Sequence, residues 1–389
     1  MHIEFFSSSW DVISTFLILI TTLLLALKIA PSFEISHKTS LWLFSWHTLF
    51  CIAYLIYSLV IGADSLKYYA QSLYIIDEFK LGTVFIKKFT SIFSQQLHLS
   101  YLSCFLIYNF FGFIGLISFA GALKQAVLDK SKRIKQICWI IIFLPSVSFW
   151  SAALGKDSIS FMAAGLALWS ALNFRKRLGL FIFAVLAMLM VRPHMAAVML
   201  ASYALAFVFD KRTSIVQRFI VGSISLVASA ILIPFAMQYA GLGDAQNASD
   251  IEDYIDQRQG YNLEGGSSVD ISSMSLPMQL FTYLFRPIPF EAHSIFTLAA
   301  SFDNVILLLL AAFGFIAMIK RVPPSVESNR AFLWLYVIIS WFIFATTTAN
   351  LGIAMRQKWM FVPMLIFLLL SVIGTRKVNN EKVTNVIAK

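Results

Sequence analysis

Five short segments of this apolar chain contain side chains that could do chemistry. Each combines fixed cations, carboxylates or imidazoles with small or aromatic neighbours over a few positions. Arginine binds phosphate oxygens through two parallel hydrogen bonds, and lysine adds a mobile point charge. These residue types therefore predict a binding site for a phosphate-bearing ligand. The segments are 62–69, 155–158, 192–194, 283–293 and 350–358.

The cations and their polar neighbours are the expected contacts to such a ligand. One ligand of this kind is a lipid-linked sugar, which carries a phosphate or pyrophosphate. Breaking its sugar–phosphate bond builds negative charge on the leaving group, so fixed cations would assist catalysis as well as binding. The alternative for each cation is a rim position against lipid headgroups, or a snorkelling side chain in the case of Lys156. The residues predicted to bind substrate are Tyr68, Lys156, Arg192, His194, Arg286 and Arg356.

A hydroxyl group that attacks the sugar also needs a base. The catalytic candidates by chemistry are Asp64, Glu291 and His293. Asp157 is less suited because the adjacent Lys156 offers it a local partner. Asp64 and Asp157 could instead be N-caps of the helices that follow them. The sequence leaves the identity of the base open.

The composition of the chain is that of a polytopic membrane protein. Of its 389 residues 59% are hydrophobic and 13% are charged, and the mean hydropathy is +0.78. A soluble domain contains about 25% charged residues. Cys51, Cys104 and Cys138 lie in apolar runs without metal-type spacing, so we expect free, buried thiols. We likewise expect His47 to be a hydrogen-bonded histidine of the helix core.

The apolar segments predict an all-α fold with about eleven transmembrane helices in a single integral membrane domain, 1–389. About 20 apolar residues cross the hydrocarbon core as a helix. The fifth to seventh segments are short and closely spaced. The predicted spans are 10–30, 41–62, 101–123, 137–154, 158–174, 178–191, 195–209, 219–240, 302–320, 331–349 and 359–374.

The distribution of charge predicts the orientation of these spans. Placing the N-terminus outside and the C-terminus in the cytoplasm puts 20 of the 30 Lys and Arg inside, but only 5 of the 20 Asp and Glu. This satisfies the positive-inside rule. The formal net charge of +10 is therefore mostly explained by topology, and we expect no nucleic-acid partner. All five reactive segments then face outward.

Two larger segments are predicted at the outer face. Residues 63–100 contain apolar side chains at a spacing of three to four between 81 and 97, which predicts an amphipathic helix at the membrane surface. Residues 241–301 begin as an acidic, Gly/Ser-containing loop. From Leu276 onward the segment is apolar and aromatic, so this half should dock back on the membrane.

The order of these motifs resembles bacterial membrane proteins of polysaccharide gene clusters. They are Gly-x-Asp-x-x-x-Tyr from Gly62, Pro-Ser-x-x-Phe-Trp-Ser from Pro145 followed by Lys-Asp, Arg-Pro-His from Arg192, Phe-Arg-Pro-x-Pro-Phe-Glu-Ala from Phe285, and Asn-x-Gly-x-x-x-Arg-Gln from Asn350. The chain is similar in this respect to EpsG-like proteins and O-antigen polymerases (Wzy), whose architecture is related to the GT-C glycosyltransferases. The resemblance spans most of the chain.

The resemblance implies a glycosyltransferase of the bacterial inner membrane. Its donor and acceptor would be undecaprenyl-linked oligosaccharides, joined into O-antigen or exopolysaccharide at the periplasmic or outer face. Asp64 would be the acidic residue of the first outer loop, and Arg192, Arg286 and Arg356 the donor-phosphate contacts. The partners implied are the lipid bilayer and a chain-length regulator. We expect no cofactor and no metal site, since the acidic motif is a single Asp rather than the paired form of many GT-C enzymes.

Two alternatives remain from the sequence. The first is a GT-C enzyme that transfers one sugar from a polyprenyl-phosphate donor. The second is a polysaccharide transporter or lipid flippase, which favours charged residues at mid-membrane, internal repeats and broken helices in corresponding halves. We find no internal repeat, and nearly all charges lie at the ends of spans. The polymerase is therefore the preferred prediction.

Overall fold

The computed structural model describes residues 6–209, 268–292 and 294–374, together with the isolated residues 216, 222, 223 and 227. Within these residues every regular element is a helix, apart from one antiparallel bridge between Ser268 and Asn350. The all-α prediction is confirmed for this part of the chain. Most of the predicted span at 219–240 lies outside the described residues, as do residues 241–267 and His293.

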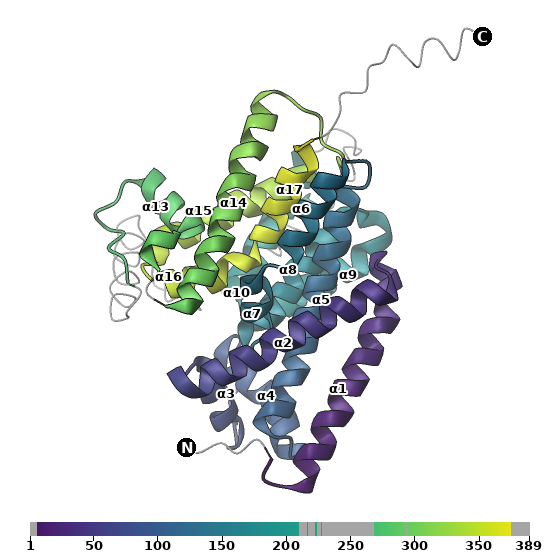
Figure 1. The fold of residues 1–389 in the computed structure, drawn as a ribbon, viewed down its shortest axis with the longest axis vertical. Coiled ribbons are helices and arrows are strands. Elements are labelled where there is room, and N and C mark those ends of the chain that lie inside the picture. Colours follow the sequence, from purple (N-terminus) through teal and green to yellow (C-terminus); the bar gives the residue numbers. More distant parts are fainter. Residues whose placement is uncertain are drawn as a thin grey trace, which may run out of the picture.

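From α1 to α10, and again from α13 to α17, the helices follow one another with short connections (Figure 1). Ser and Asn side chains cap several of them: Ser8, for example, accepts a hydrogen bond from the Asp11 amide in a capping box. In chain order they are α1 (Ser9–Ile29), η1 (Ala30–Phe33), α2 (His37–Ile61), α3 (Asp64–Ser72), α4 (Thr83–Ser91), η2 (Ile92–Gln96), α5 (Tyr101–Ala126), α6 (Lys132–Ile142), α7 (Pro145–Ser151), α8 (Lys156–Ala171), α9 (Phe174–Val191), α10 (Pro193–Phe209), α13 (Leu276–Phe285), η3 (Pro289–Glu291), α14 (Ile295–Ile319), α15 (Arg330–Thr347), α16 (Leu351–Gln357), η4 (Lys358–Met360) and α17 (Val362–Val372).

Six of the described helices are long and apolar enough to cross a membrane. A seventh is possible by length if Leu351–Met360 and Val362–Val372, which meet at a bend of 64°, form one broken span. The structure thus supports a membrane protein with six to seven such helices among the described residues. It does not confirm the predicted eleven, because α8 and α10 are shorter than these helices and α9 begins with three basic residues.

The centre of the bundle is the close packing of α5 and α8 (Figure 1). A Cβ atom added to Gly165 would lie 2.5 Å from the Gly115 carbonyl oxygen, so only glycine fits at this crossing. Small residues allow two helix backbones to approach in this way. Most of α5 is buried as a result, and this rigid pair positions the connections at both of its ends.

The predicted core histidine and cysteines are confirmed. His47 is fully buried, with Nδ1 lying 2.6 Å from Asn109 Oδ1 and Nε2 lying 3.0 Å from Ser151 Oγ. Both ring nitrogens are therefore used inside the bundle, where α2, α5 and α7 meet. Cys51, Cys104 and Cys138 are free and buried.

The described connections that were predicted to be cytoplasmic gather at one end of the bundle, here called the basic end. Lys130 Nζ donates hydrogen bonds to the carbonyl oxygens of Ser371 (2.9 Å) and Ile373 (2.7 Å), at the end of α17. Ser325 Oγ and Asn329 Nδ2 donate to carbonyl oxygens at the ends of α5 and α8 (2.6 and 2.8 Å). Segments near 126–131, 171, 325–330 and 371–373 are thus side by side.

The predicted outer segments contain helices in their described parts. The amphipathic helix at 81–97 is confirmed as α4, continued by η2, a short π-helix. A further helix, α3, precedes it. From Leu276 the second segment forms the predicted apolar return as α13, which buries Tyr283, Leu284 and Phe285 against the bundle. Its docking on the membrane stays a prediction.

Candidate functional site

Two arginine–aspartate ion pairs meet at the end of the bundle opposite the basic end. Arg192 Nη2 lies 2.6 Å from Asp157 Oδ1, and Arg356 Nη1 lies 3.2 Å from Asp64 Oδ2. Asp64 opens α3, Asp157 lies in the first turn of α8, Arg192 joins α9 to α10, and Arg356 is on α16. Four segments that are distant in the sequence therefore supply one charged cluster.

The two pairs are close enough to act on each other electrostatically. Burial alone would raise the pKa of Asp157, but Arg192, Arg356 and Lys156 outweigh burial and lower it. The pKa of Tyr68 is raised by burial and by the negative charges of both Asp64 and Asp157. Tyr68 and Arg356 each interact electrostatically with the carboxylates of both Asp64 and Asp157. The two ion pairs therefore form a single site rather than separate surface salt bridges. We call Asp64, Lys156, Asp157, Arg192 and Arg356 the ion-pair cluster.

Lys156 contributes a third cation from a partly buried position. Its Nζ donates to Thr83 Oγ1 at 2.9 Å, at the start of α4. A second contact holds the start of α4 against the site. The amide of Gly82, directly before α4, donates a hydrogen bond of 2.8 Å to the Met190 carbonyl oxygen. Burial and the nearby Arg192 lower the pKa of Lys156 to about 8. The prediction that Lys156 is the local partner of Asp157 is wrong, since Asp157 pairs with Arg192.

Several donors in the site lack a hydrogen-bond partner among the described residues. They are Arg192 Nε and Arg356 Nε, together with the hydroxyl of Tyr283, all of which are shielded from solvent. Buried polar groups are almost always hydrogen-bonded, because an unmade bond costs about 1–3 kcal/mol. Each arginine thus pairs with an aspartate through an Nη nitrogen, and its Nε–H is available to a ligand. The oxygens of an oxyanion would supply the acceptors that these N–H groups lack.

The four paired side chains differ in their access to solvent. The Asp64 side chain is 46% exposed, compared with 16% for Asp157, 11% for Arg192 and 26% for Arg356. The Arg192–Asp157 pair is therefore the floor of the site, and Asp64 is the carboxylate that an incoming substrate would meet. Neither aspartate is an N-cap, because Ala63 and Gly155 occupy those positions.

Arg286 forms an ion pair of a different kind. Its Nη2 lies 2.6 Å from Glu291 Oε1, its Nε donates to both carboxylate oxygens, and Glu291 Oε2 also accepts from the Ile288 amide. All of these contacts lie within one turn after α13. Arg286 and Glu291 thus pair with each other. The other predicted Lys and Arg residues, Lys156, Arg192 and Arg356, belong to the ion-pair cluster.

The other predicted residues line the same end of the molecule. Tyr68 lies against Gly155, where an added Cβ would come within 3.3 Å of its ring. The His194 ring packs edge-on against Phe344, with centroids 6.3 Å apart, and Phe344 stacks on Tyr283. His194 is therefore part of the aromatic wall. His293 lies outside the described residues.

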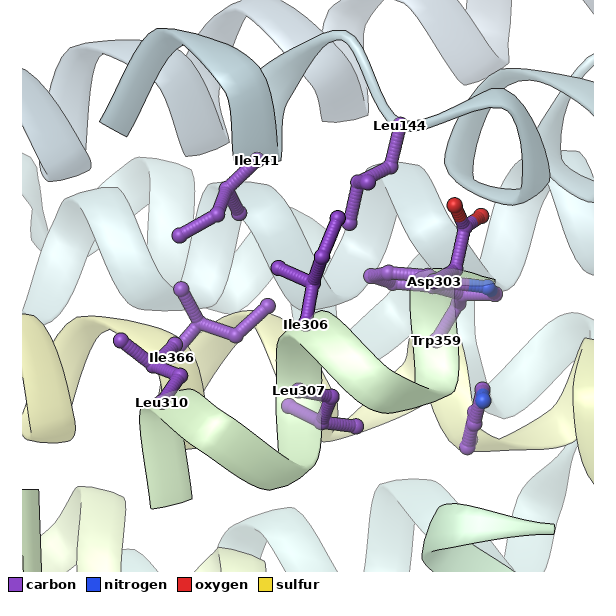
Figure 2. A pocket seen from close by; sticks show the side chains of 9 residues that line it. Ile141, Leu144, Asp303, Ile306, Leu307, Leu310, Trp359 and Ile366 are labelled. Atoms are coloured by element: carbon purple, nitrogen blue, oxygen red, sulfur yellow. The ribbon is translucent and has the colours of Figure 1, made fainter. Parts of the chain in front are cut away.

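Sequence reasoning placed Lys358 in the last outer turn and missed Asp303, whereas the structure buries both below the site. Lys358 and Asp303 are 2% and 4% exposed and line a small apolar cavity between α6, α14 and α17. Figure 2 shows the Asp303 carboxylate beside Trp359 on the wall of this cavity. A single aspartate within the 25-residue apolar helix α14 was the available signal, because charges inside a span are costly and mark functional positions.

Comparison with known proteins leaves the family open. No protein-family model matches the chain, and no curated protein and no solved structure matches it either. Among the described residues no group of three or more His, Cys, Asp or Glu is arranged to hold a metal ion. The function must therefore be inferred from the site itself.

Proposed function

We propose that this protein is a membrane glycosyltransferase of the polysaccharide-polymerase type. Its substrate would be a saccharide carried on a polyprenyl pyrophosphate. The observation that carries the proposal is the ion-pair cluster, in which Arg192 and Arg356 each keep a buried N–H that has no partner in the described part of the chain, beside the third cation, Lys156. A pyrophosphate supplies the acceptor oxygens that these groups need, at the end of a bundle of apolar helices.

The arginines would stabilise the leaving group. The donor phosphate accepts hydrogen bonds from Arg192 Nε and Arg356 Nε, while their other nitrogens stay on Asp157 and Asp64. Because the carboxylates hold the guanidinium groups in place beforehand, little reorganisation is needed when charge develops. Lys156 adds a third positive charge in its protonated form.

The base in this proposal is Asp64. Its side chain is the most exposed of the paired groups of the ion-pair cluster, and it is held by a contact of 3.2 Å to Arg356 Nη1. The acceptor hydroxyl oxygen forms a bond to C1 of the donor sugar, its proton passes to Asp64, and the bond from C1 to the phosphate oxygen breaks. The electron pair leaves with the polyprenyl pyrophosphate. Glu291 is less suited, because Arg286 and the Ile288 amide already occupy its oxygens.

The proposal includes the predicted topology. Eleven spans with the N-terminus outside would put the ion-pair cluster at the periplasmic face of the inner membrane and the basic end in the cytoplasm. The gathering of the basic connections at one end and of the ion-pair cluster at the other supports this arrangement. The donor's lipid tail would then lie among the helices, with the saccharide in water.

A transporter or flippase is the second candidate, and one observation favours it. The segment that contains Lys358 is bent by 64° between α16 and α17, and charged residues lie buried beside the bend. Broken helices with buried charge are typical of transporter binding sites. The two functions differ in whether a covalent product forms.

The test is the length of the surface polysaccharide in cells that depend on this chain. We expect Arg192→Ala and Arg356→Ala to abolish long chains, while single lipid-linked repeat units still accumulate at the outer face. Arg133→Ala, on the exposed surface of the basic end, is the control and should leave chain length unchanged. Material stalled before a complete repeat would indicate the single-sugar transferase. Repeat units trapped at the inner face would indicate the flippase.

A further inference from the structure

Three buried polar residues under the site have no role in the proposed chemistry. Asp303 and Asn304 are neighbours on α14, and Lys358 begins η4. All three are nearly or fully buried. A charge at the centre of a span costs about 2.5–3.5 kcal/mol by insertion scales, and apolar residues would pack such a junction at lower cost. The presence of two opposite charges here therefore needs a reason.

Asn304 joins two segments that carry predicted site residues. Its Nδ2 donates to the Pro287 carbonyl oxygen at 2.9 Å, in the turn that holds the Arg286–Glu291 pair. Its Oδ1 accepts from Lys358 Nζ, two residues beyond Arg356. Both the oxygen and the nitrogen of the Asn304 side-chain amide are thus hydrogen-bonded. These two bonds connect the turn after α13 to the end of α16.

Asp303 joins a third segment. Its Oδ2 accepts a hydrogen bond of 2.9 Å from the Ser146 amide in the first turn of α7. A carboxylate at this position complements the positive end of the helix. Because α7 ends at Ser151, shortly before Lys156 and Asp157, this contact helps to position the segment that leads into the ion-pair cluster.

We propose that Asp303, Asn304 and Lys358 are positioning residues that hold the Arg286 turn, the Arg356 segment and the start of α7 in one fixed relation. We call these three residues the buried junction. Arg286 would then serve the same donor as Arg192 and Arg356, even though its own ion pair is local. The assignment of that donor as a pyrophosphate rests on the proposed function. A purely structural role would stabilise the fold without coupling these segments.

The test is hydrogen exchange of the purified protein in lipid nanodiscs, followed by peptide mass analysis. We expect Asn304→Ala to speed exchange at least tenfold in peptides covering 286–292 and 351–360. Asn304→Asp keeps an acceptor for Lys358 but removes the donor to Pro287, so it should affect 286–292 only. Ser301→Ala is the matched control, because the buried Ser301 hydroxyl donates to the Leu298 carbonyl oxygen within its own helix. Unchanged exchange at 286–292 in folded Asn304→Ala would overturn the buried junction.

Kinetics separate this inference from the proposed function. With a lipid-linked donor, Asn304→Ala should lower kcat about tenfold, because small misplacements of catalytic groups slow a reaction strongly. Its KM should change less, and Asn304→Asp should recover part of the loss. If exchange changes as expected but the unaltered protein transfers no sugar, the buried junction stands and the proposed function fails. If the unaltered protein is active and Asn304→Ala retains its full kcat, the positioning role fails.

Discussion

The two ends of the helix bundle use the same cationic side chains in different ways. At the basic end Lys130 donates to the backbone carbonyl oxygens of Leu370, Ser371 and Ile373 at the end of α17, and Arg330 Nη1 donates to Ser371 Oγ at 2.5 Å. At the other end Arg192 and Arg356 pair with aspartates and each keep a buried Nε without a partner among the described residues. A cation that caps a helix is satisfied by the fold itself. The ion-pair cluster is left incomplete, which indicates a ligand.

The largest expected effect comes from removing both arginines of the ion-pair cluster. Replacing Arg192 and Arg356 together by Ala should lower sugar transfer by about 1000-fold, because removing even one preorganised donor costs about 10²–10³ in kcat. The measurement is turnover of lipid-linked donor per folded molecule. Arg330→Ala at the basic end should leave this turnover within a few-fold of normal. Equal losses from both changes would erase the distinction between the ends.

The two aspartates should separate catalysis from folding. Asp64→Asn should lower kcat about 100-fold, as expected for loss of a general base, with little effect on the yield of folded protein. Asp157→Asn should instead reduce that yield, because it leaves the buried Arg192 without its partner. Both variants are assayed for folded protein by gel filtration and for turnover. A fully active Asp64→Asn variant would exclude Asp64 as the base.

At the basic end we expect a buried cation to contribute to stability and not to activity, and Lys130 tests this expectation. Lys130→Met removes a cation that caps α17 while keeping the length of the side chain. Hydrogen bonds to charged groups contribute about 1.5–3 kcal/mol, so the free energy of unfolding should fall by about 2 kcal/mol. The Tm in detergent, followed by tryptophan fluorescence, should drop accordingly. Activity per folded molecule should not change.

A smaller effect is expected from pH through Lys156. Burial and Arg192 lower its pKa to about 8 in the folded protein, below the ordinary lysine value. The unfolded chain therefore binds more protons between pH 8 and the ordinary value of 10.5, and this group makes stability rise with pH in that window. Phosphate binding needs the protonated form, so kcat/KM should fall as pH rises above about 8. Lys156→Arg should move this decline to higher pH in the measured pH profile.

The sequence predicted the helical membrane architecture and the position of several local features. The outer amphipathic helix at 81–97, the return of the chain from Leu276 and the buried role of His47 all follow from spacing and composition over short distances. The eleven predicted spans are not confirmed, because α8, α9 and α10 are short or interrupted by charge. These local patterns depend on neighbours in the chain, which a sequence displays directly.

The pairing of charges could not be predicted in the same way. Asp64 and Arg356 are 292 positions apart, and no local pattern relates them. Lys156 and Asp157 are adjacent, yet their side chains bind Thr83 and Arg192 because the packing of α4 and α9 decides the outcome. The buried junction was missed for a similar reason. Asn304 contacts two segments that become neighbours only in the folded bundle.

The central claim is that the ion-pair cluster binds a phosphate. It is tested most directly by titrating the purified protein in nanodiscs with farnesyl pyrophosphate, a short soluble polyprenyl pyrophosphate, and measuring the Kd by calorimetry. We predict that replacing Arg192 and Arg356 together by Ala weakens binding by at least 100-fold, whereas Arg133→Ala at the basic end has no effect. Equal Kd values for the unaltered protein and the double variant, with both folded, would contradict the claim.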